Sequence, residues 1–192
     1  RSLAEPVDGN YAGPFDDHYS AIVASVRASG GNLTVDSSGD VYGAIVTANY
    51  SPGTTSISLN KVIFNYRNYY DAGITALNTQ GGDLNVTLYG EVMATDSSAI
   101  KLNSAGQQVD ANTKLDIRQV VTGATNGAIV ESENDIVVEL TATGSLTGTS
   151  QRGLYAKGTA SGTAITVSGI GDTPSGTITG GTDGIRAETQ GG

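Results

Sequence analysis

The sequence predicts an all-β protein, a right-handed single-stranded parallel β-helix of about six to seven rungs. A unit of 23–31 residues recurs along the chain, and its clearest copy is 71–94, DAGITALNTQGGDLNVTLYGEVMA. Within each copy, short runs of alternating apolar and polar residues are separated by Gly, Asn and Asp, a pattern typical of strands joined by turns. No segment keeps apolar residues at helical spacing for three turns, because glycine interrupts each one.

Each copy opens with a small residue followed by an aliphatic one, as in Gly73-Ile74. The aliphatic opening positions are Ile22, Ile45, Ile74, Ile100, Ile129, Leu154 and Ile185. In a stack of parallel strands these side chains lie inside, about 4.8 Å apart. We therefore expect Ile74 and Ile100 to be direct neighbours, in parallel strands.

Two further pieces follow in each copy. An alternating aliphatic pair comes first: Leu33/Val35, Ile57/Leu59, Leu84/Val86, Leu115/Ile117, Val138/Leu140 and Ile165/Val167. A Gly-x-aliphatic step follows: Gly39/Val41, Gly90/Val92, Gly144/Leu146 and Gly176/Ile178, with Val62-Ile63 and Val120-Val121 replacing it in copies two and four. Three short strands per copy match one coil of a parallel β-helix, since alternation sends successive side chains to opposite faces.

The chain divides into an N-terminal segment, 1–19, and the repeats. The copies span 20–43, 44–70, 71–97, 98–126, 127–152 and 153–182, and 183–192 begins a seventh. The segment 1–19 is either a cap over the first rung or a linker. The enlarged turn at 104–113 and the insertion at 169–175 are expected to leave the stack as loops.

Other all-β folds fit the pattern less well. A β-sandwich does not repeat its pattern so evenly, and propeller blades are longer, about 40 residues or more.

Composition excludes several function classes. The net charge is −9 and the ten cationic residues are spread singly, which argues against nucleic acid as a partner. The absence of cysteine excludes a disulfide framework and thiol chemistry, and no cofactor is implied. No stretch is long and apolar enough for a membrane span, and no signal peptide opens the chain. We interpret the chain, which starts at Arg1 and stops within a copy, as a processed or excised piece of a longer array.

The motif [SAG]-[AG]-[IL]-x-[AT] … G-G-x-[LI]-x-V … G-x-V-x-[GA] resembles the passenger repeats of Gram-negative autotransporter (type V secreted) proteins. Copies one, three, five and six match best, and the resemblance extends from about Ser20 to the end. It implies an exported passenger at the bacterial cell surface or secreted from it, acting as an adhesin. The implied partners are a host cell-surface or extracellular-matrix protein or glycan, with self-association of the rods as an alternative.

Parallel β-helices also include pectate-lyase-like enzymes, so a polysaccharide lyase or hydrolase is the alternative function. Such chemistry needs carboxylates that converge on one outer face. The candidate group is Asp36, Asp40 and Glu91, with Asp40 and Glu91 expected in one column. Copy two lies between them without an acid, which favours solvated surface acids.

Two other groups of titratable residues suggest metal binding less strongly. A lone histidine, His18, follows Asp16 and Asp17 in the N-terminal segment, where a histidine is far more often neither ligand nor base. Glu131, Glu133 and Asp135 alternate through a turn, as calcium ligands can. They lack the Gly-Asp repeat of calcium-binding nonapeptides, so we expect a repelling surface that discourages edge pairing.

The segment FNYRNYY at 64–70 stands out among copies rich in Ser, Thr and Asn. Tyr and Arg are enriched where proteins bind partners, because they combine a large area with a polar tip. The candidate ligand-binding residues are therefore Tyr66, Arg67, Tyr69 and Tyr70. Packing of this loop against a neighbouring rung is an equally supported interpretation, and a stalk without a ligand is a third functional hypothesis.

Overall fold

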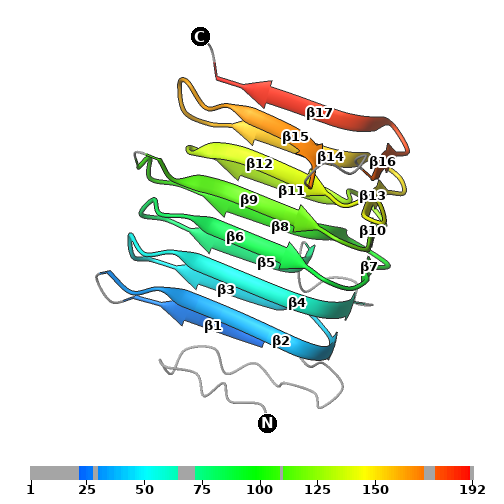
Figure 1. Cartoon of the computed structure of the whole chain (residues 1–192), viewed down its shortest axis with the longest axis horizontal. Helices are drawn as coiled ribbons and strands as arrows, with labels where there is room; N and C mark the ends of the chain where they lie inside the picture. Colours follow the sequence, from blue (N-terminus) through cyan, green and yellow to red (C-terminus); the bar gives the residue numbers. More distant parts are fainter. Residues whose placement is uncertain (1–21, 28–29, 65–71, 109, 171–175, 191–192) are drawn as a thin grey trace.

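The structure, a computed structural model, describes residues 22–27, 30–64, 72–108, 110–170 and 176–190. The described residues form strands and turns without a helix (Figure 1). The strands are β1 (Ile22–Val26), β2 (Leu33–Tyr42), β3 (Ile45–Asn49), β4 (Thr55–Phe64), β5 (Ala72–Asn78), β6 (Leu84–Leu88), β7 (Val92–Ala94), β8 (Ser98–Ser104), β9 (Asn112–Ile117), β10 (Val120–Gly123), β11 (Ala128–Ser132), β12 (Asp135–Leu140), β13 (Ser145–Gly148), β14 (Arg152–Gly158), β15 (Ile165–Gly169), β16 (Thr177–Gly180) and β17 (Asp183–Thr189).

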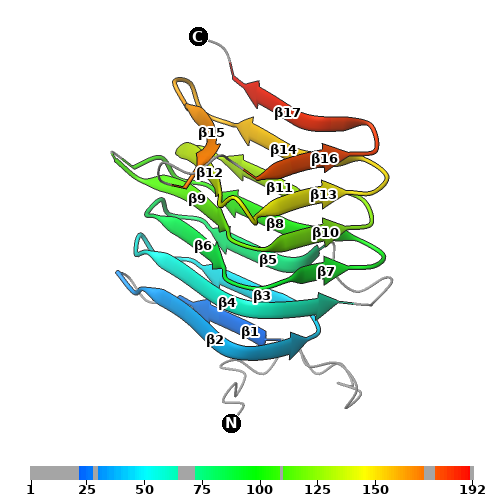
Figure 2. The same ribbon diagram turned by 45° about the vertical axis from the view of Figure 1, so that its right-hand side comes forward.

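The strands stack into three parallel ladders. The first ladder runs β1-β3-β5-β8-β11-β14-β17. The second sheet bends into two more, because the long β2 and β4 each serve both. The second ladder is β2-β4-β6-β9-β12-β15 and the third is β2-β4-β7-β10-β13-β16. Figure 2 shows β7, β10, β13 and β16 stacked in order above β4. The predicted parallel β-helix is confirmed.

The number of rungs differs slightly from the expected six to seven. Of the seven strands in the first ladder, β1 and β17 are the ends, so the solenoid has about five enclosed turns. At the end formed by β15 and β17, Val167 and Ile185 are 37 % and 49 % exposed, whereas Val138 and Leu154, one rung below, are fully buried.

The opening residues form an interior column as predicted, except in copy five. Ile74 and Ile100 are paired in parallel strands, as expected. Beside Ile100, however, lies Ala128 and not Ile129. Ala128 is fully buried, whereas Ile129 is partly exposed on the outer face beside Lys101. A slip of one residue exchanges the two faces of a strand, so the predicted position of Ile129 in this column was wrong.

The alternating pairs face inward as expected, but their register differs from the prediction in copies two, four and five. Ile57 lies beside Val86, and Leu59 lies beside Leu88. A shift of two residues preserves the face of a side chain, which is why the pattern alone did not reveal it. The third strands stack as predicted, with Val41, Val62, Val92, Val121, Leu146 and Ile178 in one interior column.

Buried polar side chains form the last interior column of the first ladder. Asn49, Asn78, Ser104 and Ser132 occupy it in successive coils. Asn49 donates through Nδ2 to the Gly53 carbonyl at 3.0 Å, and its Oδ1 accepts from the Ser51 amide at 3.0 Å. Buried polar groups need such partners, and here they fix the turns that lead from the first ladder to the second.

Candidate binding surfaces

The four residues predicted to bind a ligand, Tyr66, Arg67, Tyr69 and Tyr70, lie outside the described residues. They follow directly after β4, whose last residue, Phe64, is buried. The segment 1–19, with Asp16, Asp17 and His18, also lies outside the described part.

An exposed apolar column lies on the outer face of the third ladder. Tyr42 of β2 pairs with Ile63 of β4, and Ile63 pairs with Met93 of β7. Tyr42 is 57 % exposed and Met93 is 36 % exposed. We call Tyr42, Ile63 and Met93 the Tyr42 column. Sequence analysis missed it, although the signal was present: each residue follows an interior valine and must therefore face outward.

Of the three acids predicted as a catalytic group, Asp40 and Glu91 lie beside this column. Asp40 and Glu91 share a column, as predicted, and copy two contributes Lys61 between them. Lys61 Nζ lies 3.6 Å from Glu91 Oε2, and Lys61 is the register partner of Asp40. Asp36 lies apart, exposed on the second ladder beside Ser58. The three carboxylates do not converge on one point, and only Asp40 and Glu91, with Lys61, form a charged rim to the Tyr42 column.

The acids of copy five separate. Glu131 lies on the outer face of the first ladder between Asn103 and Lys157. Glu133 Oε2 accepts a hydrogen bond from the Gly106 amide at 2.8 Å, and Asp135 Oδ1 accepts one from the Ala164 amide at 2.8 Å. A purely repelling surface is therefore the wrong description, because two of the carboxylates join neighbouring coils. Within the described ranges, no group of three or more His, Cys, Asp or Glu residues could hold a metal ion.

A polar cavity of about 380 Å³ lies among the turns between the first and second ladders, and we call it the edge pocket. Its walls are the turns that join the first and second ladders in copies four, five and six, which line up along the left edge of Figure 1. The lining residues are Gln107, Gln108, Asp110, Ala111, Asn112, Glu133, Asn134, Asp135, Gly162 and Thr163. The enlarged turn predicted at 104–113 falls at the connection between β8 and β9, and its described residues supply half of this lining.

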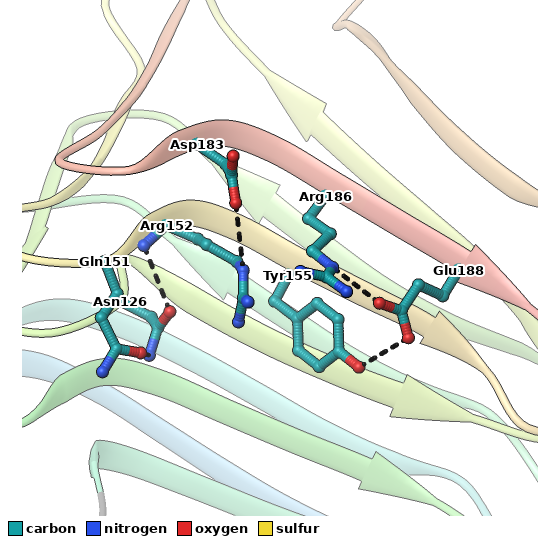
Figure 3. Close-up of polar contacts among 7 residues, drawn as sticks. All are labelled: Asn126, Gln151, Arg152, Tyr155, Asp183, Arg186 and Glu188. Atoms are coloured by element: carbon teal, nitrogen blue, oxygen red, sulfur yellow. Dashed lines mark hydrogen bonds and ion pairs between the residues drawn. The ribbon is translucent and has the colours of Figure 1, made fainter.

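A third group lies on the outer face of the first ladder, across β14 and β17 (Figure 3). The Tyr155 hydroxyl donates to Glu188 Oε2 at 3.0 Å, and Arg186 Nε donates to Glu188 Oε1 at 2.6 Å. Arg152 lies with its guanidinium carbon 4.9 Å from the centre of the Tyr155 ring and pairs with Asp183 at 3.4 Å. Burial, and then the hydrogen bond to Glu188, raise the pKa of Tyr155 above its ordinary value. The side chains satisfy one another across the two strands, which fixes the register of β17.

A similar group lies on the second ladder. Lys114 Nζ contacts Glu139 at 2.7 Å and Asp116 at 3.4 Å. The hydrogen bond to Glu139 is the main cause that raises the pKa of Lys114, whereas burial raises the pKa of Asp116. Next to them, the Arg118 guanidinium lies 4.7 Å from the centre of the exposed Tyr89 ring. Lys114 thus pairs with Glu139 of the neighbouring coil and with Asp116 of its own strand.

The fold and these surfaces define a parallel β-solenoid with an exposed apolar column, a polar edge pocket and internally paired surface charges. No family model, no curated protein and no solved structure matches the chain. In the part of the chain that the structure describes, no helix is long and apolar enough to cross a membrane.

Proposed function

We propose that this chain is a non-enzymatic binding and spacer module, a passenger segment of the autotransporter type that acts as an adhesin at a bacterial surface. The observation that carries the proposal is the Tyr42 column. Three coils place an aromatic ring, an isoleucine and a methionine side by side on the outside of the solenoid. Aromatic residues and Met are enriched in protein interfaces relative to the rest of the protein surface.

The surroundings of the column support a contact with a protein. Asp40, Lys61 and Glu91 form a charged column two residues before it in each coil. An apolar centre with a polar rim is the ordinary anatomy of a protein interface. The Tyr42 hydroxyl also donates to Asp40 Oδ2 at 3.4 Å, which links the ring to the rim. We therefore favour a host-surface or extracellular-matrix protein as the ligand.

The solenoid itself supports the spacer role. The interior columns continue from coil to coil, and parallel ladders connect each strand to the next. In such stacks each repeat contacts only its neighbours, so length is added without changing the surface already present.

The polysaccharide-degrading alternative has no such support. Its candidate acids were Asp36, Asp40 and Glu91, and Lys61 lies within ion-pairing distance of Glu91 while Asp36 stands on another ladder. The two functions are separated by incubating the protein with polygalacturonate and alginate, with and without calcium. Turnover that disappears in Asp40→Ala or Glu91→Ala would replace our proposal with an enzyme.

Binding is tested by screening the immobilised protein against matrix proteins and host cells. The double variant Tyr42→Ser/Met93→Ser is compared with Thr122→Ser/Thr147→Ser, which changes outward positions of the same ladder in later coils. We expect the first variant to lose attachment at least about tenfold, the effect of removing one or two interface anchors, with unchanged circular dichroism. The second should bind normally.

The variant Tyr66→Ala/Arg67→Ala/Tyr69→Ala/Tyr70→Ala tests the adjoining segment in the same assay. Attachment that survives both sets of changes would remove the proposed surface. A screen that returns no ligand would favour a stalk.

A further inference from the structure

The edge pocket is separate from the Tyr42 column, because it lies at the turn between the first and second ladders. Its volume of about 380 Å³ is within the range of small-ligand sites, about 300–1,000 Å³. Most such sites are lined mainly by apolar side chains. Here the lining consists of three carboxylates, four carboxamides and one hydroxyl, with only Ala111 and Gly162 as apolar members.

The walls of the pocket are fixed by hydrogen bonds between coils. The buried side chain of Asn134 donates to Ser104 Oγ at 3.3 Å and accepts from the Gln108 amide at 3.0 Å. The Glu133 carboxylate accepts from the Gly106 amide. Thr163, also buried, donates to the Glu133 carbonyl at 3.3 Å. These contacts already hold the side chains of Glu133, Asn134 and Thr163, so binding does not require these side chains to be immobilised.

The groups that remain for a ligand are mainly acceptors. Glu133 and Asp135 each use one carboxylate oxygen for a backbone amide, which leaves the second oxygen. The exposed Asp110 adds a third carboxylate, and Gln107 adds a carboxamide. No Lys or Arg residue is part of the lining. The pocket therefore favours a positively charged ligand with several N–H and O–H donors and disfavours an anionic one.

We propose that the edge pocket binds a basic glycan through a glucosamine unit, a ring that carries an ammonium group beside hydroxyl donors. The ammonium group lies against the acidic lining to which Asp110, Glu133 and Asp135 each add a carboxylate, without the three converging on one point. The carboxamides of Gln107 and Asn112 accept from the ring hydroxyls. A charge-assisted hydrogen bond contributes more than a neutral one, so the amine dominates affinity and the hydroxyls determine that the ligand is a sugar.

Titration calorimetry on the full chain provides the test. The probes are a glucosamine oligomer, its N-acetylated counterpart, spermidine, and a galacturonate oligomer. We expect the glucosamine oligomer to bind, and the N-acetylated oligomer to bind at least about tenfold more weakly, because the charged hydrogen bonds are lost. Galacturonate should not bind, and spermidine should bind more weakly than the sugar because it lacks hydroxyls.

The variants Asp110→Asn and Glu133→Gln remove one charge each and keep the shape of the side chain. Asp110 has a positive φ of 63°, and Asn tolerates this backbone conformation as well as Asp does. Each variant should weaken glucosamine binding at least about tenfold, while Glu131→Gln, on the outer face outside the pocket, should not.

Equal binding of the N-acetylated oligomer, or unchanged affinity in Asp110→Asn and Glu133→Gln, would overturn the proposal. Equal binding of spermidine would overturn the assignment to a sugar. Absence of binding by the glucosamine oligomer would refute the site and leave the Tyr42 column untouched, because that surface is tested by other variants and other ligands.

Discussion

Ala128 lies directly beside Ile100 inside the solenoid, and this relationship sets the register of β11 on β8. On the opposite face, Ile129 lies beside Lys101. The interior column therefore has a small side chain at copy five, where Ala128 lies between Ile100 and Leu154. Ile129, although it is the larger residue, contributes to the surface.

This register predicts opposite sensitivities for two isoleucines. Ile100→Ala should lower the free energy of unfolding by about 2–5 kcal/mol, because it leaves a cavity among fully buried neighbours. Ile129→Ala should change it by no more than about 1 kcal/mol, as is usual for a partly exposed position. Urea denaturation followed by circular dichroism measures both. A loss in Ile129→Ala as large as that in Ile100→Ala would mean that the sequence-based position of Ile129 inside the solenoid was correct.

The same pair shows what sequence alone could and could not provide. The repeat, the parallel stack and the faces of most strands follow from period-2 alternation. The segment Gly127-Ala128-Ile129 fits the opening motif only with Ile129 in the aliphatic position, whereas the structure gives that position to Ala128. Only contact with the neighbouring strand decides between them.

Whether each candidate site could be predicted from the sequence also depended on the contacts between neighbouring coils. The Tyr42 column could have been found, because its members follow the interior valines of the third strands. The edge pocket could not, since its walls come from turns of three copies and their arrangement depends on hydrogen bonds between coils such as that from Gln108 to Asn134. The position of Lys61 could not be predicted either, because only the register of the strands places it between Asp40 and Glu91, where it pairs with Glu91.

Asn49 should be among the most sensitive polar residues. It is fully buried and holds the turn after β3 through Gly53 and Ser51. Asn49→Ala leaves those backbone groups without partners, which costs about 1–3 kcal/mol. The matched control is Asn103→Ala on the outer face of the same ladder, where we expect a change within about 0.5 kcal/mol. Thermal denaturation of both variants checks this, and equal melting temperatures would show that the buried amide is not needed.

Gly148 lies at a turn that is too tight for a side chain. A Cβ there would overlap the carbonyl oxygen of Arg152, at the turn from the third ladder back to the first. Gly123 and Gly180 occupy the same column in the neighbouring coils. Gly148→Ala should therefore destabilise the protein by about 1–3 kcal/mol, the usual effect of overpacking.

Gly39 provides the control for this steric argument. A Cβ at Gly39 would meet no atom within 4 Å, so Gly39→Ala should stay within about 0.5 kcal/mol of the parent protein. If both alanine variants unfold at the same urea concentration, the close approach at Gly148 is not what requires glycine.

The pair formed by Tyr155 and Glu188 predicts a dependence of stability on pH at both ends of the scale. Burial and the hydrogen bond to Glu188 raise the pKa of Tyr155 above its ordinary value of 10.0. The folded protein thus retains the phenol proton at a pH where the unfolded chain has lost it. The stability this provides is complete below pH 10.0 and is lost as pH rises through the raised pKa. Hydrogen bonds from Arg186 and then Tyr155 lower the pKa of Glu188 below 4.5, so its contribution is complete above pH 4.5 and is lost as pH falls through the lowered pKa.

The variant Glu188→Gln tests this coupling. It removes the negative charge from the side chain that accepts the hydrogen bond of the Tyr155 hydroxyl. The pKa of Tyr155 should therefore fall toward its ordinary value, although burial keeps it from returning fully. The measurement is an NMR titration of tyrosine labelled at Cζ, with Tyr155→Phe to assign the resonance. Glu91→Gln, on the third ladder, serves as the control and should leave the titration unchanged. A pKa of Tyr155 that is the same in Glu188→Gln as in the parent would contradict the hydrogen bond as a cause and leave burial alone to explain the shift.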